Sequence, residues 1–298
     1  MRQLVLKLYS THYYPELLEK FSIEGFLLPI KKFSDHSDVL YDIEAIEDLV
    51  LKIQSQNKHI FAWLNRFMFE DEIDDFRALL NSLKSLGFNG IAYLDLGISK
   101  LMDELNLDLE KIYISDPSIT NSQDYRIVAK FNSKVLLSRE LTQEELLEIG
   151  ANHGDTALVS IYGHQLMSIS RRPLLSSYGE FVNIDVERHK IYRLKEQKRE
   201  EPYYLFEDET STSIFDGRVL IDFEGIQAFK NVGMKHFLVE GFNRPKQEFL
   251  NTIELLEAIY QETMTIEEAL NQFNQSYPEV VLTEGLRKTK TSDRKVEV

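Results

Sequence analysis

The sequence of 298 residues contains no cysteine. This absence excludes disulfide bonds, cysteine nucleophiles, thiolate zinc sites and any iron–sulfur cluster held by cysteines of this chain. Proline and glycine are scarce, with seven and 13 residues, so long disordered linkers are not expected. No apolar run approaches the roughly 20 residues that span a bilayer, and residues 1–14 lack the features of a signal peptide. We therefore expect a cytoplasmic protein that does not engage a membrane.

Basic residues are also in deficit, because 34 Lys and Arg stand against 49 Asp and Glu, which gives a formal net charge of −15. Binding to a polyanion such as RNA requires a basic face on which counterions are released. The average surface therefore argues against unaided binding to nucleic acid. A local basic patch can coexist with an acidic whole, and the simplest role of the charge is to keep the protein soluble.

Short apolar runs alternate with longer segments of helical periodicity. Eight runs are typical of buried parallel strands, and seven of them are followed by a helix before the next strand. This is the count of an α/β protein with a (β/α)8 TIM-like barrel. The expected strands are residues 4–9, 25–30, 59–65, 90–95, 111–116, 134–138, 157–163 and 235–241. The expected helices are residues 15–21, 42–56, 70–86, 98–105, 121–131, 142–150, 225–233, 245–262 and 266–273.

The alternation of strands and helices is interrupted between the seventh and eighth strands of the barrel. Alternating apolar and polar residues predict a small β insertion at about residues 179–217, with strands at 182–186 and 203–208. A doubly wound sheet is the alternative fold, but it would carry a glycine-rich phosphate turn after its first strand, and "YSTHYYPE" contains no glycine. We expect one barrel domain over residues 1–283 and a charged, flexible tail over residues 284–298.

In such barrels the site lies at the carboxyl ends of the strands. Polar residues cluster at or after these ends: His12, Asn65, Arg66, Asp95, Asp116, Arg139, Glu140, His164, Arg171, Arg172 and Glu240. The two adjacent arginines offer rigid forked donors that suit a carboxylate or phosphate ligand. The histidines lack metal-ligand spacing, and there is neither a Gly-x-Ser-x-Gly elbow nor a Walker loop. The residues thus predict an anion-binding mouth without a bound metal and without an identifiable nucleophile.

Structural roles compete with these assignments. Asp95 and Asp116 fit better as caps of the helices that follow them. Arg139 and Glu140 could instead form a structural ion pair with each other or with neighbours. Glu240 ends an apolar strand, where a carboxylate is costly unless it is paired or used, and Arg139 or Arg172 would be a natural partner.

Two blocks, "SRELTQEELLEI" (138–149) and "ALVSIYGHQLMSISRRPLLSSY" (157–178), resemble the signature region of the peptidase U32 (collagenase-like) family. That pattern runs Ser-Arg-Glu-Leu, a strand, His-Gly-Ala-Leu-Cys and Ser-Gly-Arg-Cys-Leu-Leu-Ser. "YYLFEDETSTSIFDGRVLIDFEGI" and "FLVEGFNRPKQEFL" are similar to the family's later segments, with Glu240 and Gly241 retained. The matching positions of the second block are Gly163, Ser170, Arg172, Leu174, Leu175 and Ser176.

The departures from the family pattern bear on the chemistry. Tyr162 replaces the family's histidine, Leu166 and Pro173 replace its two cysteines, Arg171 replaces a glycine, and Phe242 replaces an arginine. Family members with four cysteines hold an iron–sulfur cluster and hydroxylate RNA bases or quinone precursors. The resemblance therefore implies no cofactor in this chain, because it has no ligands for that cluster.

The chain resembles a short, cysteine-poor kind of family member that accompanies a longer, cysteine-bearing one. Such pairs are linked to 5-hydroxylation of the wobble uridine of tRNA, with prephenate as the co-substrate. The resemblance implies an accessory subunit in a hetero-oligomer, where the partner carries the cluster and tRNA binds only through the complex. A small di-acid would then bind at a site formed by these residues: Arg139, His164, Arg171, Arg172, Ser176 and Glu240.

Two other functions remain open. One is the collagenase-like peptidase that the family name denotes, for which a carboxylate pair such as Glu140 and Glu240 would have to replace the absent nucleophile. The other is a non-catalytic interaction subunit, which predicts a barrel mouth filled by side chains. Candidate catalytic residues under the enzymatic hypotheses are Glu240, Arg139 and Glu140.

Overall fold

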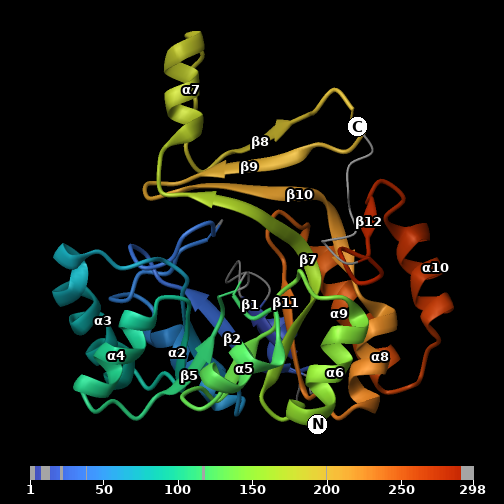
Figure 1. The fold of residues 1–298 in the computed structure, drawn as a ribbon, viewed down its shortest axis with the longest axis horizontal. Helices are drawn as coiled ribbons and strands as arrows, with labels where there is room; N and C mark the ends of the chain where they lie inside the picture. Colours follow the sequence, from blue (N-terminus) through green and yellow to red (C-terminus); the bar gives the residue numbers. More distant parts are fainter. Residues whose placement is uncertain are drawn as a thin grey trace.

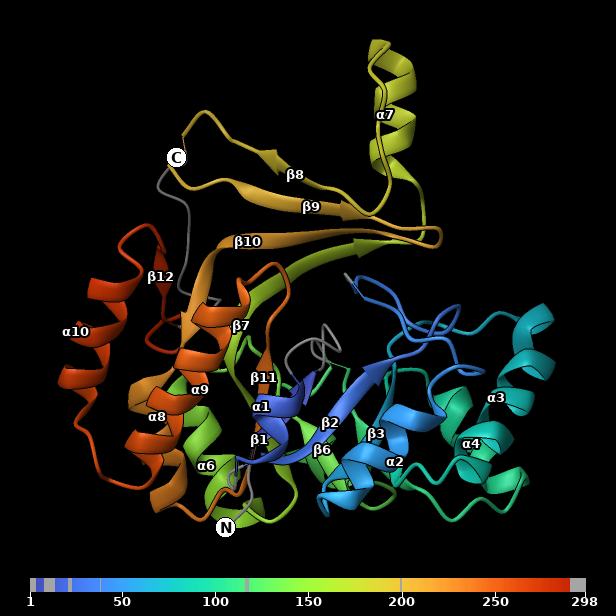
Figure 2. The same cartoon turned by 180° about the vertical axis from the view of Figure 1, so that it is seen from behind.

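The computed structural model describes residues 4–7, 14–20, 23–37, 39–115, 118–198 and 200–289. His12 and Asp116 lie outside these residues, so the roles expected of them are left as predictions. The described residues form an α/β fold in which a curled, mostly parallel sheet is covered on its outside by helices (Figures 1 and 2).

Eight strands make up the curled sheet, and each pairs in parallel with its neighbours in chain order. The last of them, β11, pairs in parallel with both β7 and β1. Their carboxyl ends therefore point to one end of the sheet, which we call the mouth. The strands are β1 (Leu4–Lys7), β2 (Ile23–Pro29), β3 (His59–Leu64), β4 (Gly90–Tyr93), β5 (Glu110–Tyr113), β6 (Lys134–Leu136), β7 (Ala157–Ser170) and β11 (His236–Glu240).

Near-continuous apolar sequence gives strands such as β2, β3 and β4 two buried faces, as expected for parallel strands. On the concave face, one cluster joins residues of seven strands, among them Leu27, Phe61, Ile112 and Leu238. The other face packs against the helices through a larger cluster. The helices are α1 (Tyr14–Leu18), α2 (Glu47–Ser55), η1 (Glu70–Glu72), α3 (Ile73–Ser85), α4 (Leu96–Glu104), α5 (Ser122–Val128), α6 (Gln143–His153), α8 (Phe223–Asn231), α9 (Lys246–Tyr260) and α10 (Ile266–Ser276).

The expected β insertion is present, but it is larger than predicted and begins inside β7. At Gly163 (φ +126°) β7 leaves its parallel pairing with β11 and continues in antiparallel pairing with β10. A Cβ at this position would lie 2.5 Å from the Glu240 carbonyl oxygen, so only glycine fits the crossing. We call the inserted part, residues 164–220, the arm.

The arm is a four-stranded antiparallel sheet with one helix, and it extends across the mouth (Figures 1 and 2). Its elements are the second half of β7, α7 (Leu174–Val182), β8 (Ile191–Leu194), β9 (Tyr203–Glu207) and β10 (Thr212–Ile221). The predicted strand at 182–186 is wrong, because Val182 ends α7 and the next four residues form no strand. The short apolar run followed by Asn183 in the left-handed conformation is a helix end rather than a strand.

The sequence suggested a flexible tail over residues 284–298, but residues 284–289 are folded against the sheet, and residues 290–298 lie outside the described residues. Leu282–Thr283 form β12, which pairs with β10. Arg287 is buried, and its guanidinium donates to Asp222 Oδ2 at 2.8 Å and to the Ser160 carbonyl at 2.8 Å. A buried pair with a further backbone acceptor ties this segment to the sheet.

Candidate functional site

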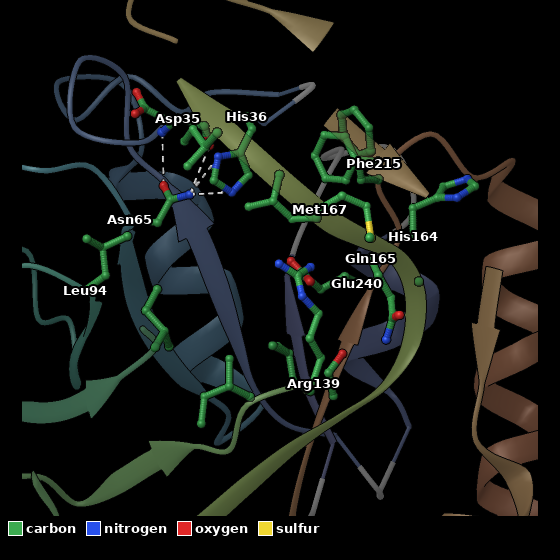
Figure 3. Close-up of a pocket in the computed structure, with 18 of the residues that line it drawn as sticks. Asp35, His36, Asn65, Leu94, Arg139, His164, Gln165, Met167, Phe215 and Glu240 are labelled. Atoms are coloured by element: carbon green, nitrogen blue, oxygen red, sulfur yellow. Dashed lines mark hydrogen bonds between the residues drawn. The ribbon is translucent and has the colours of Figure 1, made fainter. Parts of the chain in front are cut away.

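A cavity of about 360 Å3 lies between the mouth of the curled sheet and the arm (Figure 3). Its apolar base consists of concave-face residues that include Trp63, Leu136 and Leu238. The arm covers it with Leu166 and Phe215, among other residues. A largely apolar pocket with a few polar groups at the carboxyl ends of parallel strands is the usual form of a ligand site in such folds.

Five residues of the predicted strand-end set line this cavity: Asn65, Arg139, Glu140, His164 and Glu240. Arg139 and Glu140 come from the segment after β6, and Glu240 is the last residue of β11. Figure 3 shows the Arg139 side chain pointing toward Glu240. Among the described residues, the lining includes the Arg139 guanidinium and, with Asp35, three carboxylates. The sequence predicted an anion-binding mouth, and acidic side chains outnumber the guanidinium among these lining residues.

Asp35 is a lining residue that the sequence did not identify. The Thr210 hydroxyl, in the β9–β10 turn of the arm, donates to its carboxylate. Burial, and secondarily the nearby Asp208 carboxylate, raise the pKa of Asp35, against the effect of the Thr210 hydrogen bond. Asp35 accordingly retains a proton at a higher pH than an exposed aspartate does.

The same region fastens the arm to the mouth. The His36 backbone N–H donates to Asp208 Oδ2 at 3.0 Å, and Asn65 exchanges hydrogen bonds with the Asp35 backbone at 3.0 and 3.2 Å (Figure 3). His36 and Asp208 are 172 residues apart in the sequence. No local sequence pattern signals such a contact.

His164 lines the cavity as predicted, but both of its ring nitrogens are engaged. Nδ1 lies 2.9 Å from the Asp216 carbonyl, and Nε2 lies 3.2 Å from Arg244 Nη1. Because a guanidinium only donates, Nε2 accepts and Nδ1 carries the proton. Burial, and then the positive charge of Arg244, lower the pKa of His164 to about 4. The ring is neutral at pH 7 and presents no spare donor to an anion.

Arg171, Arg172 and Ser176 do not line the cavity. Arg171 donates from Nη1 to the Phe67 carbonyl at 2.8 Å, and its guanidinium lies 4.3 Å from the Phe69 ring centroid. It thereby joins the arm to the segment after β3. Arg172 is exposed, and its carbonyl accepts from the Thr212 hydroxyl at 2.8 Å.

Ser176 belongs to the first turn of α7, where its hydroxyl donates to Glu207 of β9. The Glu207 carboxylate also accepts from the backbone N–H groups of Leu175 (2.8 Å) and Ser176 (3.2 Å). Burial alone would raise the pKa of Glu207, but the bonds from Ser176 and Thr212 and from these backbone groups hold it below its usual value. The Glu207 carboxylate caps the N-terminus of α7. The hydrogen bond from the Ser176 hydroxyl to Glu207 is therefore a structural contact.

The capping role of Asp95 is confirmed. Its Oδ1 accepts from the Gly97 N–H at 2.7 Å at the start of α4, and its Oδ2 accepts from the Met68 N–H at 2.8 Å. Arg66 also has structural partners, because its guanidinium pairs with Glu72 and donates to the Lys32 carbonyl. Both side chains organise the segment after β3.

A buried polar network behind His164 was not predicted. Arg244 Nε donates to Glu248 Oε1 at 2.8 Å, and the Tyr162 hydroxyl donates to the same oxygen at 3.0 Å. Glu248 is only 1% exposed. The four-residue spacing of Arg244 and Glu248 at the start of α9 is a signal that sequence analysis could have used. Tyr162, which stands where the family has histidine, donates to Glu248, and Glu248 pairs with Arg244, which contacts His164.

The positions that match the family's cysteines do not suit a metal cluster. Leu166 lines the cavity with an aliphatic side chain, and Pro173 precedes α7 at the surface. Neither side chain can ligate iron. In the part of the chain that the structure describes, there is no group of three or more His, Asp or Glu residues suited to a metal ion.

Helices long and apolar enough to cross a bilayer are absent from the described residues.

Comparisons with known proteins identify one family. The model of peptidase family U32 matches residues 34–290. The chain is 22% identical to tRNA hydroxylation protein P2 of Bacillus subtilis (strain 168) over 204 residues, which are 65% of this chain and 66% of that protein. It is 30% identical to the uncharacterized protease MJ0090 of Methanocaldococcus jannaschii over 128 residues, which are 41% of this chain and 31% of that protein.

Among solved structures, the U32 peptidase Mk0906 aligns with a TM-score of 0.50 at 13% identity and covers 80% of this chain and 92% of that one. This likeness concerns the fold. The alignments with the two curated relatives span less than two thirds of the relatives' own lengths.

Proposed function

Because this chain belongs to peptidase family U32, we propose that it is an accessory subunit of a complex that 5-hydroxylates the wobble uridine of tRNA. In this proposal a longer, cysteine-bearing family member carries the iron–sulfur cluster and most of the chemistry, and tRNA binds through the complex. The similarity to tRNA hydroxylation protein P2 supports it. We also propose that the ring of eight paired parallel strands is of the (β/α)8 TIM-like class.

The observation that carries the proposal is the cavity at the mouth, which keeps Arg139 and Glu240 in a chain without cysteine. A site that retains a guanidinium but has lost the family's cluster ligands suits the binding of a co-substrate better than redox chemistry. We propose a small di-acid such as prephenate as that co-substrate. The third hypothesis, an interaction subunit with a filled mouth, is not favoured by a cavity of about 360 Å3.

The charges of the lining predict how a di-acid would bind. The described lining residues include one guanidinium and three carboxylates, so the isolated chain should bind a dianion weakly. Glu240→Gln should tighten binding by at least about fivefold, because one like charge beside a ligand costs on the order of 1 kcal/mol even when it is screened as in water. Arg139→Ala should abolish it. Isothermal titration calorimetry with prephenate measures both effects.

Arg126→Ala, at an exposed position of α5, is the matched control for this titration and should leave the affinity unchanged. Equal affinity in the wild type and in the Arg139 and Glu240 variants would place the di-acid outside this cavity.

The function itself is tested in the native cell. Deletion of the gene should remove the 5-hydroxylated wobble uridine from tRNA, as measured by mass spectrometry of digested tRNA. The wild type and Arg126→Ala should restore the modification, whereas Arg139→Ala should not. Unchanged modification in the deletion strain would refute the role in hydroxylation.

A collagenase-like peptidase is the second candidate, because Glu140 and Glu240 line the same cavity and a relative is named a protease. Two carboxylates can act as acid and base on a water molecule when they are close and hold different pKa values. Cleavage of gelatin by the purified wild type, lost in Glu240→Gln, would favour this activity over hydroxylation.

A further inference from the structure

One segment of the arm departs from the acidic character of the chain. Residues 188–199 contain six Lys or Arg and one Glu, a formal charge of +5 within a chain of −15. Residues 188–198 of this segment include β8 and the turn that follows it. This is a local cluster of positive charge, flanked in the sequence by Glu187, Glu200 and Glu201.

The cations of the β8–β9 hairpin are on the surface and interleave with aromatic rings. Five of them are exposed in the described part of the hairpin: Arg188, Lys190, Arg193, Lys195 and Lys198. The Lys190 ammonium lies 5.9 Å from the Tyr192 ring centroid, and the Arg193 guanidinium lies 5.7 Å from the ring centroid of Tyr204.

The carboxylates next to these cations hold them weakly. Lys190 lies 3.6 Å from Glu187, and Arg188 lies 4.0 Å from Glu207. Pairs with an exposed member contribute little in water, so both cations can exchange these partners for phosphate groups at small cost.

We propose that the β8–β9 hairpin is an RNA-binding surface of this chain. The inference rests on the proposed role in tRNA modification and assigns part of the RNA contact to this subunit rather than to its partner. Clustered cations bind the phosphate backbone through counterion release, and neighbouring tyrosine rings stack on unpaired bases. A lipid surface fits less well, because a membrane-anchoring helix carries Lys or Arg on its polar face, whereas α7, "LLSSYGEFV", has none.

The hairpin is coupled to the cavity through strand pairing. β8 pairs with β9, β9 pairs with β10, and Phe215 of β10 lines the cavity. Two strand spacings separate β8 from β10, which is about 10 Å. In Figures 1 and 2 the hairpin lies on the side of β10 that faces away from the curled sheet. RNA held on the hairpin would therefore lie beside the arm that covers the cavity.

The test compares two triple variants of the full chain that lose the same charge. The first is Lys190→Gln with Lys195→Gln and Lys198→Gln. The control is Lys52→Gln with Lys100→Gln and Lys130→Gln, three exposed positions on or next to outer helices. Binding of a fluorescein-labelled tRNA transcript is followed by fluorescence anisotropy over a series of KCl concentrations.

We expect the hairpin variant to bind at least about tenfold more weakly and its slope of log K against log salt to shrink by about 2 to 3, one unit for each lost phosphate contact. The control should keep both the affinity and the slope. Equal weakening of both variants, or no binding by the wild type at low salt, would overturn the inference. So would a hairpin variant that aggregates yet binds tRNA normally, because the lysines would then serve to protect the free edge of β8.

The tRNA modification assay separates this inference from the proposed function. A hairpin variant that binds tRNA as tightly as the wild type and restores wobble hydroxylation would refute the hairpin and leave the function intact. Loss of a co-purifying protein with unchanged tRNA affinity would make the hairpin a protein interface and would also refute it.

Discussion

Replacement of Glu248 by alanine is expected to lower the free energy of unfolding by about 3 to 5 kcal/mol, the cost of removing one partner of a buried ion pair. Glu248 is 1% exposed and accepts from Arg244 Nε at 2.8 Å and from the Tyr162 hydroxyl at 3.0 Å. The variant leaves the Arg244 guanidinium, which is itself largely shielded from solvent, without its counter-charge. Equilibrium unfolding in urea measures the change.

A matched control is available on the same helix. Lys246 of α9 pairs with Glu16 at 2.6 Å, with both side chains more than 40% exposed. Glu16→Ala should lower the free energy of unfolding far less than Glu248→Ala, because exposed pairs are solvated and screened. Similar losses in the two variants would mean that the Glu248 pair is not held in a low-dielectric environment.

Acidification should destabilise the protein through His164 by about 3 kcal/mol. Burial, and then Arg244, lower the pKa of this histidine from 6.5 in the unfolded chain to about 4 in the folded one, and each unit is worth about 1.4 kcal/mol. The unfolded state binds the proton first, so this stabilisation is complete above pH 6.5 and is lost as the pH falls to about 4.

The test is the difference between the wild type and His164→Gln as a function of pH. The variant should unfold more easily at neutral pH, and its disadvantage should shrink by about 3 kcal/mol by about pH 4. Parallel pH profiles for wild type and His164→Gln would show that His164 can accept a proton in the folded state.

The sequence by itself determined the elements of the curled sheet. Strand cores such as residues 59–65 and helices such as 246–260 have local periodicities, which depend only on neighbours along the chain. It also placed Arg139, Glu140 and Glu240 at strand ends, and the structure brings all three to one cavity. Parallel pairing makes this possible, since it collects all carboxyl ends at the same end of the sheet.

Only the tertiary structure decided the roles of the residues in the arm. In the sequence, an apolar strand is followed by Arg171, Arg172 and Ser176, which is the pattern expected of site residues. In the structure, β7 crosses the mouth at Gly163 and carries these residues past the cavity. Asp35 and Thr210, 175 residues apart, meet because the arm folds back onto the segment after β2. Contacts of this kind arise from the path of the backbone in space. The periodicity of a sequence indicates which positions of one element are buried. It does not indicate which distant element buries them.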